Sequence, residues 1–319
     1  MELNEQNIKK LSIIGARATF GQALLELAEK DEKLIVVNAD VSTSAGLDRF
    51  RKKFPDQYID VGIAEQNMMG IATGLASNGF HVVTTTFAPF QTMRCLEQIR
   101  VYQGYMNMPL VFVGLASGLY HSYLGNTHCS VEDIGVLRSI PNIAIECPSD
   151  CTTIVKSLEE AINYKTAVYI RLPESSPMPV VYNHDLDYSI AKANIIQNGK
   201  DIAILSHGIS LHTALEVSKK LLEQNITATV IDFHTIKPID KDCLDKISNY
   251  KTIVTIEEHN IIGGLSSAIA EYLIQKPNRN NVIICGIEDF YPHATDYNTA
   301  LEQCGLTTNQ IYNKIINSL

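Results

Sequence analysis

The sequence predicts an α/β protein that consists of two tandem three-layer domains with mostly parallel sheets. The chain has 319 residues, which is enough for about two domains of ordinary size. Short β-branched apolar runs alternate with helical patterns along the chain, as they do where a parallel sheet is covered by helices on both faces. A proline-rich stretch without periodicity, from Pro173 to Tyr188, breaks this alternation and predicts a linker.

The first domain is expected at residues 1–180. Its strands are predicted at 34–40, 58–63, 81–87, 109–116, 143–149 and 167–172. Its helices are predicted at 20–30, 67–79, 91–103 and 151–164. The helix at 67–79 has almost no charged face, which predicts burial in a core or against another subunit, and Gly70 and Gly74 would let another backbone approach closely.

The second domain is expected at residues 189–319 and repeats the same alternation. Its strands are predicted at 201–208, 227–233, 251–258 and 281–288. Its helices are predicted at 209–225, 263–275 and 307–319.

Composition excludes several classes of protein. Hydrophobic residues make up 45% of the chain and charged residues 19%, as in ordinary globular proteins. The formal net charge is -9 without any lysine or arginine run, so we expect no nucleic-acid partner and no membrane partner. The first ten residues lack the apolar segment of a secretory signal. The seven cysteines form no CxxC pair, which suggests reduced thiols and a cytoplasmic location.

Glu65 is the first candidate functional residue, because it stands where a strand-like run turns into the apolar helix. A carboxylate there is either a helix N-terminal group favoured by the macrodipole or a group that is used, since burying it unpaired is costly. The next predicted strand ends at Phe87, with Phe90 just beyond, and ligands bind at the carboxyl ends of parallel strands. These three residues could hold a flat, protonatable ring. Core packing is the alternative for the two phenylalanines, and it is the better explanation when they are considered alone.

A set of ordered segments resembles the transketolase family. The segments are residues 16–44, "VGIAEQNMMGIATGLASNG", "TTTFAPFQTMRCLEQIR", "THCSVEDIGVLRSIPNIAIECPSD", "VYIRLPE", "KPID" and "EEHNIIGG". They match the pyrimidine-binding and C-terminal domains that form the C-terminal part of a full transketolase. The resemblance implies a thiamine-diphosphate-dependent transfer of a two-carbon ketol unit between sugars or sugar phosphates.

The resemblance implies a catalytic and cofactor-binding role for Glu65. It places this glutamate on N1′ of the thiamine aminopyrimidine, where a shared proton stabilises the imino tautomer that activates the thiazolium carbon. Phe87, Phe90 and Met93 match the wall around the pyrimidine ring. Asp40 is expected near the cofactor, or else as an N-cap of the following helix.

The family's diphosphate site, a GDG motif followed by an asparagine that holds Mg²⁺, has no counterpart in this sequence. Gly263 and Gly264 are not followed by the acidic residue and asparagine that a metal site needs. We therefore expect no metal ligand in this chain. The resemblance implies an N-terminal-half transketolase subunit as the partner that brings Mg²⁺, in an α₂β₂ heterotetramer with self-association of this chain.

Substrate residues also follow from the resemblance. Arg17, Ser44 and Arg171 fall where the family binds phosphate, and a guanidinium suits phosphate because it bonds in a bidentate way. Ion pairing is the alternative for both arginines. His128 matches a histidine that contacts the reacting part of the substrate and is also a catalytic candidate, with a core histidine as the alternative.

One loop departs from the family pattern. Ala116 replaces a histidine, and Leu124 replaces an aspartate that bonds a sugar hydroxyl. Leucine cannot make that bond, so we expect an altered acceptor. Tyr120, His121 and Tyr123 are expected to line the changed pocket. His259 receives no catalytic role, and His207 and His234 are expected to be structural.

Three other functions stay open. The chain could be the β subunit of a 2-oxoacid dehydrogenase E1 component, or a condensing enzyme like 1-deoxyxylulose-phosphate synthase. It could also be a non-catalytic interaction protein that kept the fold. The arginines and His128 favour a sugar substrate, and the joint presence of Glu65, Phe87, Phe90 and His128 argues against loss of activity.

Overall fold

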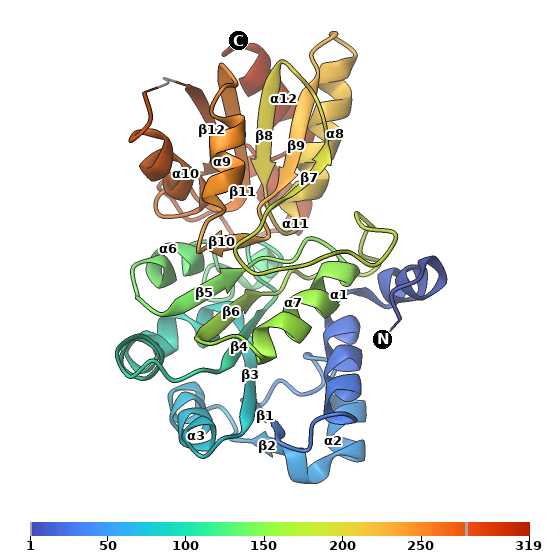
Figure 1. Ribbon diagram of the computed structural model, residues 1–319, viewed down its shortest axis with the longest axis vertical. Helices are drawn as coiled ribbons and strands as arrows, with labels where there is room; N and C mark the ends of the chain where they lie inside the picture. Colours follow the sequence, from blue (N-terminus) through green and yellow to red (C-terminus); the bar gives the residue numbers. More distant parts are fainter. Residues whose placement is uncertain (1, 278–279) are drawn as a thin grey trace.

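The computed structural model describes residues 2–277 and 280–319. It contains two sheets that are stacked along the longest axis of the molecule, with the second sheet above the first in Figure 1. Both sheets are mostly parallel and have helices on both faces, so the predicted fold class is confirmed. None of the helices within the described ranges combines the length and apolar character needed to cross a membrane.

The first sheet has seven strands within the described residues, in the order β10-β5-β6-β4-β3-β1-β2. The strands are β1 (Leu34–Asn38), β2 (Tyr58–Asp60), β3 (His81–Phe87), β4 (Val111–Leu115), β5 (Ile143–Glu146), β6 (Ala167–Arg171) and β10 (Thr235–Lys237). All neighbours pair in parallel except β10, which is antiparallel to β5.

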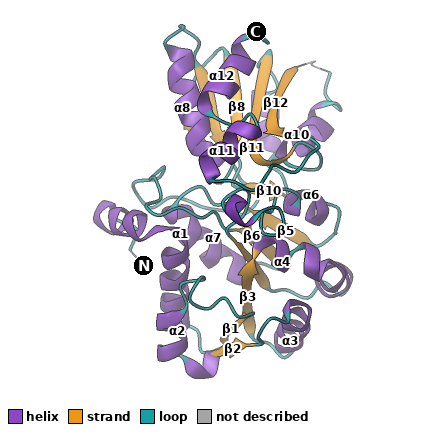
Figure 2. Cartoon of the chain, turned by 180° about the vertical axis from the view of Figure 1, so that it is seen from behind, coloured by secondary structure: helices purple, strands orange, loops and turns teal. Residues whose placement is uncertain are grey.

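Helices cover both faces of this sheet. Helices α1 (Glu5–Ala28) and α7 (Cys151–Ile162) pack on one face, and α3 (Glu65–Ser77) and α6 (Asp133–Arg138) pack on the other. Figure 2 shows α1 and α3 at opposite sides of the first sheet. Because strand residues point alternately to the two faces, Val36 packs with α1 while Val37 packs with α3.

The second sheet has five strands in the described chain, in the order β12-β11-β8-β9-β7. They are β7 (Asn194–Gln197), β8 (Ile202–Ser206), β9 (Ala228–Asp232), β11 (Thr252–Asn260) and β12 (Asn281–Ile287). The surrounding helices are α8 (Ser210–Leu222), α9 (Lys241–Ile247), α10 (Leu265–Leu273), α11 (Tyr297–Gln303) and α12 (Thr308–Ile316).

Two predicted helices differ from the observed ones. The helix predicted at 20–30 is the second half of α1, which kinks at Gly15 with a φ of 81°. A Cβ at Gly15 would lie 2.4 Å from the Ser175 carbonyl oxygen, so only glycine fits the kink. The helix predicted at 91–103 is broken into short segments, which are α4 (Ala88–Gln91), a 3₁₀ turn (Met93–Cys95), α5 (Leu96–Gln98) and a π-helix (Ile99–Tyr105).

The two sheets are joined by more than a linker. Strand β10 follows β9 in the chain but belongs to the first sheet, where Thr235 is paired with Glu146 of β5. One cluster of buried apolar side chains also continues from Ile145 of the first sheet to Phe233 and Leu265 of the second unit. The strand and the shared core fix the position of the second unit against the first.

Candidate active site

The carboxyl ends of parallel strands meet at one edge of the first sheet and carry most of the predicted residues. Asp40 follows β1, Phe87 ends β3, His121 follows β4 and Glu174 follows β6. This edge is the usual ligand-binding edge of an open α/β sheet.

Glu65 is the first residue of α3 and is only 4% exposed. Its Oε1 accepts a hydrogen bond from Nη1 of Arg94 at 2.6 Å, and the same guanidinium lies 4.0 Å from the centre of the Phe90 ring. The helix N-terminus adds a favourable field for the negative charge. The buried carboxylate is therefore paired with a flat cation that stacks on an aromatic ring.

An aromatic cluster connects Phe90 with the loop after β4. The ring centres of Phe90 and His128 are 5.2 Å apart, and those of Phe87 and His121 are 4.8 Å apart. Phe87 and Phe90 themselves pack edge to face at 6.3 Å. Glu65, the two phenylalanines and His128 are thus brought into one neighbourhood, as their predicted roles require.

Met93 and Asp40 are the two other residues predicted to bind the cofactor. The Met93 sulfur accepts a hydrogen bond from the Thr92 hydroxyl at 3.2 Å, one turn beyond Phe90. Asp40 is exposed and has a φ of 55°, and its backbone N–H donates to Oδ1 of Asp60 at 3.1 Å. The next helix, α2 (Asp48–Lys53), begins well beyond Asp40, so Asp40 is not its N-cap.

A pocket of about 590 Å³ opens beside the aromatic cluster and is lined in part by Phe87. Two residues predicted to bind substrate, Arg17 and Ser44, line this pocket. Leu124, which stands where the family has an aspartate, lines it as well. The three residues expected to re-line the changed loop, Tyr120, His121 and Tyr123, also line it. Sequence reasoning missed three further lining residues, Glu174, Asp296 and Tyr297.

Arg17 is paired inside this pocket. Its Nη2 lies 2.5 Å from Oε1 of Glu174, and Oε2 of Glu174 lies 3.5 Å from Nε2 of His121. Burial raises the pKa of the Glu174 carboxyl, and Arg17 lowers it in part. Burial, together with the charges of Arg17 and His128, lowers the pKa of His121 to about 4, so this imidazole is neutral near pH 7.

The structure does not bring Arg171 into the pocket. Its Nε lies 2.9 Å from Oδ2 of Asp133, and its Nη2 donates to the carbonyl oxygens of Ser130 and Glu258. The side chain is only 5% exposed and lies where the two units meet. Arg171 is therefore ion-paired with Asp133, which is the alternative to phosphate binding.

The three other histidines in question are enclosed by protein. His259 is fully buried, and its Nε2 accepts a hydrogen bond from the backbone N–H of Gly135 at 3.2 Å. His234 stacks on Tyr188 with ring centres 4.2 Å apart. His207 is also buried, beside Glu257 at 3.9 Å. None of them lines the pocket beside the aromatic cluster.

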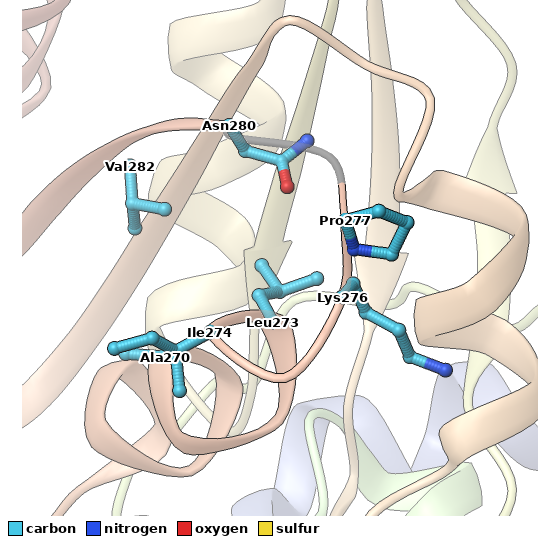
Figure 3. Close-up of a pocket in the computed structure, with 7 residues that line it drawn as sticks. All are labelled: Ala270, Leu273, Ile274, Lys276, Pro277, Asn280 and Val282. Atoms are coloured by element: carbon cyan, nitrogen blue, oxygen red, sulfur yellow. The ribbon is translucent and has the colours of Figure 1, made fainter.

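A second pocket of about 620 Å³ lies between α10 and β12 of the second unit (Figure 3). Figure 3 shows the apolar side chains of Ala270 and Ile274 side by side, whereas the side chain of Lys276 points away from them. This lysine is 2.7 Å from Asp245, and no predicted residue lines the pocket. Across residues 2–277 and 280–319, no group of three or more His, Cys, Asp and Glu residues is placed to hold a metal ion.

Two domains of known proteins match this chain. The pyrimidine-binding domain of transketolase matches residues 13–179, and the C-terminal domain of transketolase matches residues 191–311. An apulose-4-phosphate transketolase subunit of Phocaeicola vulgatus is 34% identical over 279 residues, which are 87% of this chain and 89% of that protein. The 6-deoxy-6-sulfo-D-fructose transketolase subunit SqwH of a Clostridium species is 33% identical over 316 residues, 97% of this chain and 96% of that protein.

A solved structure of a split-gene transketolase, described as an inactive beta4 tetramer, is also similar. It matches with a TM-score of 0.89 and 33% identity, over 96% of this chain and 98% of that one. The sequence relatives and the solved structure therefore agree with the two domain matches. The chain belongs to the transketolase family, of which it contains the pyrimidine-binding and C-terminal domains.

Proposed function

We propose that this chain is one subunit of a thiamine-diphosphate-dependent, transketolase-like enzyme that transfers a two-carbon ketol unit between sugars or sugar phosphates. The observation that carries the proposal is the buried carboxylate of Glu65 at the start of α3, beside the cluster of Phe87, Phe90 and His128. In transketolases this is the place of the aminopyrimidine.

The residues present fit that ring. The guanidinium of Arg94 is flat and cationic, donates an N–H to Glu65 and stacks on Phe90. A protonated aminopyrimidine is also flat and cationic and can also donate an N–H and stack on an aromatic ring, so the site accommodates a group of this chemistry. Glu65 would hold a proton at N1′, and Phe87, Phe90 and Met93 would flank the ring. When bound, thiamine diphosphate supplies the nucleophilic carbon and the electron sink.

His128 is proposed to contact the substrate next to the reacting carbonyl. Its Nδ1 lies 2.9 Å from the hydroxyl oxygen of Thr127, which leaves Nε2 to bond a substrate oxygen. The ring centre lies 6.5 Å from that of Phe87, which lines the pocket. His128 thus links the cofactor position to the space where a sugar would enter.

A partner subunit is proposed to complete the site. The sequence lacks the GDG motif and its asparagine, so the diphosphate and Mg²⁺ ligands would come from an N-terminal-half transketolase subunit in an α₂β₂ assembly. The relatives that are named as transketolase subunits, and the split-gene structure, support this division. The outer face of α3 suits such a contact, because a Cβ at Gly70 or Gly74 would meet nothing within 4 Å.

Calorimetry of thiamine diphosphate with Mg²⁺ tests the proposal. We expect no binding by this chain alone and clear binding by its mixture with the chain that carries the GDG motif, because the diphosphate and metal ligands are then supplied. Tight binding by this chain alone would contradict the split site. Absence of binding in the mixture as well would favour a non-catalytic protein.

Leu124 is expected to determine the acceptor. It is 47% exposed and lines the pocket, in the position where the family has an aspartate that bonds a sugar hydroxyl. We expect Leu124→Asp to raise kcat/KM for a hydroxylated acceptor about tenfold relative to an acceptor that lacks this hydroxyl. Leu222→Asp, a change at a 57% exposed residue of α8, is the matched control. Equal ratios in the two variants would refute this account of the loop.

A further inference from the structure

The pocket beside the aromatic cluster is poor in positive charge. Among its lining residues, all of them described, Arg17 is the one permanent cation, and Glu174 and Asp296 bring two carboxylates. His121 adds no charge near neutral pH, because burial and the neighbouring Arg17 lower its pKa to about 4. The formal charge of this lining is therefore negative, which is unfavourable for a phosphate group.

Glu174 forms an ion pair with Arg17, the one permanent cation of this lining. Its side chain is 6% exposed, and its Oε1 lies 2.5 Å from Nη2 of Arg17. A backbone hydrogen bond holds the two segments together beside this pair. The N–H of Ala16, which precedes Arg17, donates to the carbonyl of Ser175, which follows Glu174, at 3.1 Å. The kink at Gly15 allows this approach. The Arg17–Glu174 pair is thus built into the fold.

Two polar atoms beside this pair have no hydrogen-bond partner within the described structure. They are Oε2 of Glu174 and Nδ1 of His121, and both are buried. A carboxylate oxygen can only accept, so it favours a bound group that donates. Sugar hydroxyl groups donate as well as accept, whereas a phosphate dianion offers acceptors only and would meet the carboxylate with repulsion.

We propose that Glu174 is a specificity-determining residue of this pocket, which neutralises Arg17 and so selects an acceptor whose far end carries hydroxyl groups and no phosphate. This inference rests on the proposed function for the identity of the pocket, but its central claim concerns anion binding and can be measured without turnover. It also revises the expectation that Arg17 binds phosphate, because the guanidinium already has a buried carboxylate as its partner.

Inorganic phosphate is the probe for the first experiment. Its binding to the full chain is measured by calorimetry at about 0.15 M salt, which screens distant charges, and near neutral pH. The three proteins compared are the wild type, Glu174→Gln and Glu174→Gln combined with Arg17→Met. Removing the carboxylate frees the guanidinium, so we expect Glu174→Gln to bind phosphate at least about tenfold more tightly than the wild type. The double variant should lose this gain, because Arg17 is its source.

Asp296→Asn is the matched control, since it removes a carboxylate from the same pocket without touching the Arg17 pair. Asparagine still caps α11, where Asp296 now accepts from the N–H of Thr299. We expect it to change phosphate binding by less than about threefold, as a through-space charge effect that salt screens. An effect as large as that of Glu174→Gln would overturn the proposal, because total charge and not the pair would then govern binding.

The second experiment uses the complex with its partner chain, thiamine diphosphate and Mg²⁺. With one fixed ketol donor, kcat/KM is compared for D-erythrose and D-erythrose 4-phosphate. We expect the wild type to favour the unphosphorylated aldehyde and Glu174→Gln to shift the ratio about tenfold toward the phosphate. An unchanged ratio would overturn the proposal. No turnover in any variant would count against the proposed function, and the phosphate titration would still decide the role of Glu174.

Thermal melting shows whether Glu174→Gln keeps its fold. If this variant does not fold, the titration of the wild type still tests the proposal. A neutralised Arg17 should bind phosphate weakly, so wild-type binding as tight as that of a free arginine site would contradict the proposal.

Discussion

Glu65→Gln is expected to lower the kcat of the complex with the partner chain by about 10²-fold or more. Glutamine has the shape of glutamate and can still bond to Arg94, but it cannot hold the proton that general acid–base catalysis at N1′ requires. Glu65 is buried at the start of α3, so water cannot take over its role. Steady-state turnover and thiamine diphosphate affinity are the two measurements, and the loss should fall mainly on kcat.

Glu97→Gln is the control for this change. Glu97 is exposed on the same stretch of chain and pairs with Arg100 at 2.7 Å, so its replacement removes an equal charge away from the site. We expect its turnover to match the wild type. If Glu65→Gln retains kcat within a few fold, Glu65 is not the partner of N1′, and the proposed catalytic role is wrong.

Asp133→Ala is expected to destabilise the chain by about 3–5 kcal/mol, the usual cost of removing one partner from a buried ion pair. Asp133 is fully buried and accepts hydrogen bonds from Nε of Arg171 and, at 2.8 Å, from the hydroxyl of Tyr169. Its loss would leave a buried guanidinium without its counter-charge. Urea unfolding followed by circular dichroism measures the change in free energy.

Asp242→Ala provides the comparison. Asp242 is 78% exposed and pairs with Lys192 at 3.1 Å, so we expect almost no change in its unfolding midpoint. A similarly small effect of Asp133→Ala would show that Arg171 finds another partner or water at the contact between the units.

Strands whose residues are buried on both faces could be predicted from sequence alone. Runs such as 34–37 and 202–205 are continuous, apolar and rich in β-branched residues, and each lies in a fully buried strand. Strand β10 could not be predicted, because Thr235–Lys237 is three residues long and its partner, β5, lies about 90 residues earlier. Only the packing of the two units brings them together.

The site residues, like the strands, could be predicted only where a local sequence pattern marks them. Glu65, Phe87 and Phe90 occur in local motifs, and the structure gathers them with His128. Asp296 and Tyr297 reach the pocket from the second unit, and no local pattern predicts that. Arg171 has the residue type of a phosphate ligand, but burial and Asp133 decide its position. Glu174 could have been suspected, because it stands just beyond the carboxyl end of the strand predicted at 167–172, where ligands bind.

Strand β10 has a consequence for how the molecule can move. A hinge rotation of the second unit away from the first would have to break the ladder between β10 and β5 and expose the core shared by Ile145 and Phe233. Such a rotation would lose backbone hydrogen bonds and buried apolar contacts together, so opening by domain rotation is not a low-energy motion of this chain. We therefore expect a ligand to reach the pocket beside the aromatic cluster without a rotation of the second unit.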